Sequence, residues 1–186
     1  MAFFSSKEER LFKAIQDNNL GIVQRLIAKN VDTNAKDKNG WPALVDAAYY
    51  GRKEVAEALI KAGANLDLRD NDGDTALICA VCYEDQHTIR MLLDAGAKID
   101  VKNKEGVGPL DIARDEENDE IVQILETAIA ERQAAAQEVE RARRKKEMSD
   151  AVTSITAQLQ DPSRRVKAPV LKRRDKSKKP PRKTLK

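Results

Sequence analysis

The sequence repeats itself every 33 residues, and this period limits the folds open to the chain more than any other feature. Three columns of apolar residues keep their register through four copies: Leu11, Leu44, Leu77 and Leu110; Ala14, Ala47, Ala80 and Ala113; Leu26, Leu59, Leu92 and Leu125. A shorter column of glycines runs through Gly40, Gly73 and Gly106. A unit of this length cannot bury its own apolar face, so the period predicts a stack of supersecondary units, each packed on its neighbours.

Each unit is expected to hold two short helices and a turn. In the second unit, Pro42 suits the first turn of a helix, where its missing N–H is not needed. This helix is rich in alanine and ends near Gly51, and a second helix follows with larger aliphatic residues on one face. Gly63 then serves as a left-handed cap. Small residues in the first helix let two backbones approach closely, while the second helix spans to the next unit.

The unit resembles the ankyrin repeat. "DGDTALICAV" at 72–81 and "EGVGPLDIAR" at 105–114 are similar to the family signature G-x-T-P-L-H-x-A, and "LIKAGANLD" and "LLDAGAKID" are similar to its L-L-x-x-G-A ending. The resemblance covers about residues 7–127. It implies an all-α solenoid with short β-hairpin-like turns, and it divides residues 1–127 into four units at about 7–36, 37–69, 70–102 and 103–127.

The units depart from the family signature at two positions. The signature threonine occurs only as Thr75, and the signature histidine is replaced by Val45, Ile78 and Asp111 in the last three units. The hydrogen bonds that these residues make between neighbouring family repeats are therefore mostly missing. The first unit also lacks a turn glycine, and Ser6 with Glu9 has the spacing of a capping box, which is typical of an N-terminal cap.

The resemblance also implies where a partner would bind. In this family the residue after each turn glycine and the last residues of each inner helix face the partner. Those positions hold every Trp and Tyr of the chain. Large aromatic residues are ordinarily buried, but here Leu and Ala already fill the core columns. We therefore favour the interpretation that the aromatic side chains are exposed on the surface for binding. The partner-binding positions predicted in this way are Trp41, Tyr49, Tyr50, Asp74, Tyr83, Glu105, Val107, Asp115 and Glu116.

Acidic residues surround these aromatic positions in the sequence. Carboxylates beside aromatic rings suit a basic peptide, through charge complementarity and cation–π contact. A solvated acidic face kept for solubility is the alternative interpretation of the carboxylates taken alone. The leading hypothesis is therefore a non-enzymatic module that binds a protein or peptide, with a basic partner favoured.

The chain changes character after the fourth unit. Residues 128–160 contain neither Gly nor Pro and predict a helical extension of the last repeat. Ser149 is a candidate cap for a separate amphipathic helix with Val152, Ile155 and Leu159 on one face. A heptad pattern fails at Arg132 and Arg143, so the chain is expected to be a monomer or a weak helix-mediated dimer.

Residues 161–186 are rich in Pro and Lys and are expected to be disordered. From residue 163 on, twelve lysines and arginines against Asp175 give a local charge of +11, so the rest of the chain sums to −8. Such a tail could bind nucleic acid or an anionic membrane without specificity, or lie on the protein's own acidic groove. The residues expected to bind anions are Arg164, Arg165, Lys172, Arg173, Arg174, Lys178, Lys179, Arg182 and Lys183.

Several classes of function find no support in the sequence. Cys79 and Cys82 are the only cysteines and His87 is the only histidine, which is too few for a zinc site or a nucleophilic triad. No phosphate-binding glycine loop occurs, so no cofactor is expected. We find neither a secretion signal nor a long apolar run, and the chain is predicted to be cytoplasmic, or nuclear in a eukaryotic cell because of the basic tail.

Overall fold

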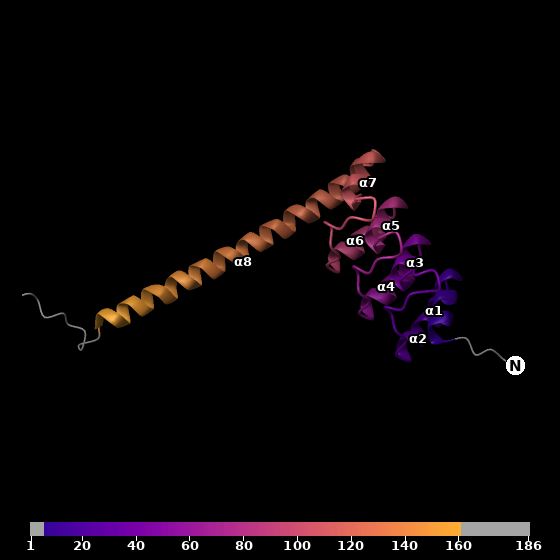
Figure 1. Cartoon of the computed structure of the whole chain (residues 1–186), viewed down its shortest axis with the longest axis horizontal. Helices are drawn as coiled ribbons and strands as arrows, with labels where there is room; N and C mark the ends of the chain where they lie inside the picture. The colour runs from indigo at the N-terminus through magenta and orange to yellow at the C-terminus, as the bar shows by residue number, and fades with distance from the viewer. Residues whose placement is uncertain (1–5, 161–186) are drawn as a thin grey trace, which may run out of the picture. The chain divides into compact units, whose positions relative to one another are not determined.

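The computed structural model describes residues 6–160, and within them the chain forms helices and turns without a β-strand. The helices pair in chain order, two to each predicted unit (Figure 1). They are α1 (Lys7–Gln16), α2 (Leu20–Ala28), α3 (Ala43–Tyr49), α4 (Lys53–Lys61), α5 (Ala76–Cys82), α6 (Gln86–Asp94), α7 (Pro109–Asp115) and α8 (Asp119–Gln160). The predicted solenoid of helix pairs is confirmed.

Side-chain caps set the starts of most of these helices. The predicted capping box is present at α1, where the Glu9 backbone N–H donates to the Ser6 hydroxyl and the Ser6 N–H donates to the Glu9 carboxylate. Thr75 caps α5 by accepting from the Ile78 N–H at 3.4 Å. Each such bond satisfies a backbone donor that has no partner inside the helix.

The core runs through the stack as the three predicted columns. Leu11, Leu44 and Leu77 are at most 2% exposed, and the matching alanines of the inner helices α1, α3 and α5 are equally buried. Because these alanines carry no bulk, α3 packs closely against both α1 and α5. The last member of the leucine column, Leu110, is only partly buried because no further unit follows α7 and α8 in the described residues.

The predicted turn glycines adopt the left-handed backbone that the register requires. Gly40, Gly73 and Gly106 have φ between 80° and 86°. At each of these turns the residue after the glycine donates its backbone N–H to a side chain four residues earlier. Asp37 Oδ1 accepts from the Trp41 N–H at 2.8 Å, and the turns at Gly73 and Gly106 repeat this bond. The only β-bridge in the described part of the chain is an isolated antiparallel pair between Lys36 and Pro42. The segments that join the units therefore form tight turns and not β-hairpins with regular strands.

Gly73→Ala is expected to lower the free energy of unfolding by about 2 kcal/mol, because φ is +86° and the new Cβ would lie 3.0 Å from the Lys104 backbone nitrogen. Gly51→Ala is the matched control, since Gly51 also has a positive φ but has nothing within 4 Å. Urea unfolding of both variants measures the difference. Equal losses would show that close packing at Gly73 contributes nothing.

Helix α8 combines the second helix of the fourth unit with the predicted extension. It continues without interruption past residue 127 and through Ser149, where the Thr153 hydroxyl donates to the Ser149 carbonyl at 2.9 Å. The separate helix predicted to begin at Ser149 was therefore wrong: the neighbouring residues all favour helix, and a serine without Gly or Pro beside it does not end one. Glu140 and Arg144, four residues apart on this helix, form an ion pair at 2.8 Å.

The chain divides into two compact units, one ending at Ala135 and one beginning at Ala136. The repeats and the first part of α8 form the first unit, and the rest of α8 belongs to the second. Among the described helices, none has an apolar stretch long enough to cross a bilayer. The basic tail predicted at 161–186, with all its candidate anion-binding residues, lies outside the described residues.

Candidate functional site

The four candidate aromatic side chains form one cluster with Tyr49 at its centre. The Tyr49 ring meets Trp41 at 4.7 Å between centroids, Tyr83 at 4.9 Å and Tyr50 at 5.2 Å, each edge to face. Perpendicular ring pairs at these distances stabilise one another beyond the area that they bury. All three pairs share the Tyr49 ring. We call this cluster the aromatic ridge: Trp41, Tyr49, Tyr50 and Tyr83.

Three elements position the aromatic ridge. Trp41 follows the turn glycine and is held by Asp37, Tyr49 and Tyr50 end α3, and Tyr83 ends α5. Because α3 and α5 pack side by side, the ends of the two helices bring Tyr49 and Tyr83 together, although the two residues are 34 positions apart in the sequence. Pairing with the Tyr49 side chain, and then partial burial, raises the pKa of the Tyr83 hydroxyl to about 12.

The ridge is displayed unevenly. Tyr50 is 44% exposed and Tyr83 51% exposed, while Trp41 and Tyr49 are partly buried and Trp41 packs against the core. A hollow of about 500 Å³ opens beside the three tyrosines, and its polar lining consists of Lys53, Glu84, Asp85, Gln86 and His87. The exposed part of the ridge therefore consists of the Tyr50 and Tyr83 rings, and both pack against the Tyr49 ring.

The carboxylates near the ridge differ in how many hydrogen bonds and ion pairs they already make within the protein. Glu84 is exposed and accepts one hydrogen bond, from the Asn118 amide at 3.2 Å. Asp85 is engaged already, because it caps α6 and pairs with Lys53 at 3.2 Å. Burial alone would raise the pKa of Asp85, but hydrogen bonds from Thr88 and the charge of Lys53 hold it below its ordinary value.

The remaining candidates lie on the third and fourth units. Glu105, Asp115 and Glu116 are exposed, whereas Val107 and Asp74 are partly buried. Burial raises the pKa of Asp74, a hydrogen bond with Asn103 opposes this, and the nearby charges of Asp70, Asp72 and Glu105 raise it further. Carboxylates that repel one another in this way would be stabilised by an added positive charge.

Asp46 is a site feature that the sequence reasoning missed. This residue of α3 is 3% exposed, and its Oδ2 has no hydrogen-bond partner in the structure. Burial, and then repulsion from Asp37, raises the pKa of Asp46 to about 6, while Arg52 works in the opposite direction. Asp46 occupies the same repeat position as Lys13, Cys79 and Ile112. The register therefore placed a carboxylate inside the apolar run "ALVDAAYY", and this could have identified Asp46 as an unusual residue.

Arg52 is a second exception in the same unit. The equivalent positions hold Asn19, Asp85 and Asn118, each of which accepts a hydrogen bond from the first turn of the outer helix that follows. Arg52 begins α4 without such a bond. Its guanidinium carbon lies 5.8 Å from the Tyr50 ring centroid, and its Nη2 donates to the Gln16 carbonyl at 3.0 Å. Asp46 has a buried carboxylate oxygen without a partner in the described part of the chain, and Arg52 is a helix start without a side-chain cap. Both features lower stability, and both lie in the unit that carries most of the aromatic ridge.

The cysteines are unsuited to nucleophilic chemistry. Burial, followed by the charge of Asp74, raises the pKa of both the Cys79 and the Cys82 thiol, so neither is activated. No group of three or more His, Cys, Asp or Glu residues capable of holding a metal ion occurs in the region from 6 to 160.

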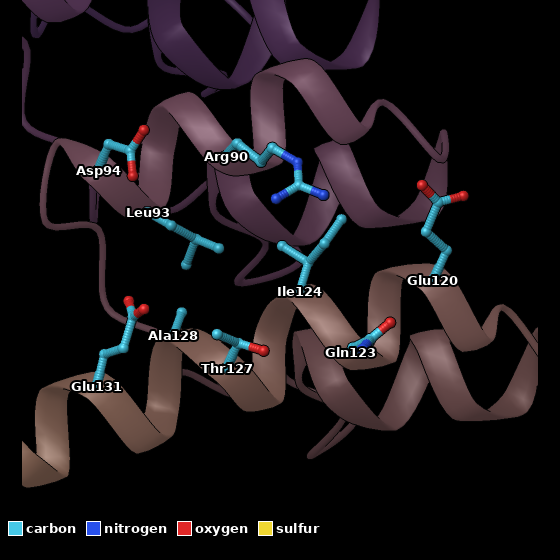
Figure 2. A pocket seen from close by; sticks show the side chains of 9 residues that line it. All are labelled: Arg90, Leu93, Asp94, Glu120, Gln123, Ile124, Thr127, Ala128 and Glu131. Atoms are coloured by element: carbon cyan, nitrogen blue, oxygen red, sulfur yellow. The ribbon is translucent and has the colours of Figure 1, made fainter.

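A second hollow, of about 440 Å³, lies between α6 and α8 on the outer side of the stack (Figure 2). Arg90 extends over Ile124 at its centre, while Asp94 and Glu131 stand together at one end and Glu120 at the other. The three buried polar atoms without partners among the described residues all lie elsewhere. The hollow therefore lacks the unsatisfied groups that distinguish the surroundings of the aromatic ridge.

Comparison with protein families places most of the repeat region in a known family. A family model described as ankyrin repeats (3 copies) matches residues 11–103, which is half of the chain. The matched region contains Trp41, Tyr49, Tyr50 and Tyr83 and ends just before the turn at Gly106. A comparison with curated proteins gives no match.

Proposed function

Because the chain belongs to the ankyrin-repeat family, whose members generally act as non-enzymatic protein–protein interaction modules, we propose that it binds a basic peptide segment of a partner protein at the aromatic ridge. The observation that carries this proposal is the contact of Tyr49 with the three other rings, two of them exposed, beside the exposed carboxylate of Glu84. Aromatic residues on a rigid base are the usual anchors of protein interfaces.

The charge around the ridge supports a basic partner. Glu84 stands in the wall of the hollow, and the mutual repulsion at Asp74 would be relieved by a lysine or arginine of the partner. An arginine already stacks near Tyr50 in the chain itself, at 5.8 Å, and the exposed ring of Tyr83 offers the same kind of contact to an incoming guanidinium.

The two exceptional residues of the second unit also support this location. A buried carboxylate without a partner and a helix without its cap both lower stability, and such departures collect where function requires them. Elsewhere in the described repeats, the equivalent positions follow the ordinary rules of capping and packing.

Tyr49→Ala is expected to weaken binding of a basic peptide by about 30-fold or more, because truncating a central aromatic anchor typically removes about 2 kcal/mol of binding free energy. A displayed peptide library selected on the full chain supplies the ligand, and calorimetry with a selected peptide measures the affinity. We expect selected peptides to be rich in Arg and Lys.

The matched control is Ile22→Ala, which removes an exposed apolar side chain from the outer helix α2. It should leave the affinity unchanged. Selected peptides without basic residues, or an equal loss in both variants, would count against the aromatic ridge as the site for a basic partner.

A further inference from the structure

The part of α8 that follows Ala136 carries an exposed line of apolar side chains. Among the described residues, four of the seven exposed large hydrophobic residues lie there, and three of them, Met148, Val152 and Ile155, are 57–68% exposed. Their spacing of four and then three residues places them on one face of the helix. We call this line the apolar seam. The fourth exposed residue, Val139, lies on the opposite face.

Basic residues continue the same face toward the N-terminus. Arg141, Arg144 and Lys145 precede the apolar seam at helical spacing and are followed directly by it. Arg144 also pairs with Glu140 at 2.8 Å. The acidic residues nearest the seam, Glu147 just before it and Asp150 within it, lie in the other half of the helix. This face therefore presents three cations and then an apolar strip.

We infer that this face of α8 binds an anionic lipid bilayer, with the apolar seam entering the interface and the three basic residues contacting the headgroups. Apolar side chains beside Lys and Arg are the arrangement by which an interfacial helix lies on a membrane, since the long basic side chains can extend to the phosphate level. The sequence after residue 163, with its charge of +11, supplies a second electrostatic attraction, and stable association generally takes two such signals.

Other occupants fit this face less well. A second copy paired in parallel would set the three basic residues against their equivalents, and an antiparallel copy would bury only the three apolar side chains of each seam. Nucleic acid would satisfy the cations but offers no apolar surface to the seam, and the helix carries no aromatic residue for base stacking.

Vesicle co-sedimentation of the full chain tests the inference. We expect binding to vesicles of phosphatidylcholine with phosphatidylserine and little binding to phosphatidylcholine alone. Val152→Gln/Ile155→Gln, which changes no charge, should weaken binding by about tenfold or more, because the buried methyl and methylene groups are lost. Val139→Gln is the control on the opposite face and should leave binding unchanged.

Arg141→Gln/Arg144→Gln/Lys145→Gln should weaken binding by about 100-fold, since each basic residue at an anionic surface contributes about fivefold. Retention of wild-type affinity in the Val152/Ile155 variant would overturn the inference and leave the tail as the tether. Absence of vesicle binding by the full chain would overturn it too, as would a seam-dependent dimer in sedimentation equilibrium or seam-dependent binding to duplex DNA.

Discussion

Asp46→Asn is expected to raise the free energy of unfolding at pH 7 by about 2 kcal/mol. Burial, with repulsion from Asp37, raises the pKa of Asp46 from 3.8 to about 6, so at pH 7 the folded state holds a buried carboxylate that the unfolded state would solvate. Each unit of this difference corresponds to about 1.4 kcal/mol. Asparagine has the same shape without the charge, so the substitution removes most of this penalty.

The stabilisation should also depend on pH in a defined direction. An acid whose folded pKa lies above its unfolded pKa takes up its proton earlier in the folded state, so the penalty is complete above about pH 6 and is relieved as the pH falls toward 4. We therefore expect the difference between Asp46→Asn and the wild type to be about 1 kcal/mol smaller at pH 5 than at pH 7.

Urea unfolding of both proteins at the two pH values measures this double difference, in which the other titrating groups cancel. Asp17→Asn is the control, an exposed carboxylate at the end of α1 that should change stability little at either pH. A loss of stability in Asp46→Asn at pH 7 would mean that the ionised carboxylate makes a favourable contact, and that its burial is not a penalty.

Leu77→Ala should lower the free energy of unfolding by about 3–5 kcal/mol. Leu77 is fully buried in α5, between the neighbouring inner helices α3 and α7, and its truncation leaves a cavity that the alanine-rich helices around it cannot close. In a solenoid, such a loss affects the packing on both sides of the damaged unit, because each unit is stabilised by its neighbours.

The control is the same substitution at the same register position, Leu110→Ala. Leu110 is only partly buried, since no described unit follows it, and we expect a loss of about 1–2 kcal/mol. Thermal and urea unfolding of the two variants give the comparison. Equal losses would indicate that something covers Leu110 in solution, and sedimentation equilibrium would then show whether it is a second copy.

The elements themselves could be predicted because they depend on local rules that the 33-residue period repeats. The columns that contain Leu77 and Ala80, the left-handed turn at Gly73 and the capping box at Ser6 follow from side-chain size, backbone freedom and hydrogen-bonding groups that each residue carries with it. The prediction failed where it depended on one residue: Ser149 was expected to begin a new helix, but the helix-forming residues around it keep α8 continuous.

The candidate site could be predicted only in part. The family resemblance, carried over through the register, implied that Trp41, Tyr49, Tyr50 and Tyr83 lie on one surface. It did not show that Tyr49 contacts the other three rings or that Trp41 and Tyr49 are partly buried. Those facts depend on how far apart α3 and α5 pack and on which way each ring turns, and neither is a property of one repeat.

The sequence by itself determined the period, the helix pairs and the family, because all three arise from residue types that recur at fixed spacing. Only the tertiary structure decided that Asp46 is buried without a partner and that Arg52 lies over Tyr50. The physical reason is that the state of a charge depends on its surroundings: packing between α1 and α5 buries α3 with Asp46, and the Gln16 carbonyl of the first unit accepts a hydrogen bond from the Arg52 guanidinium.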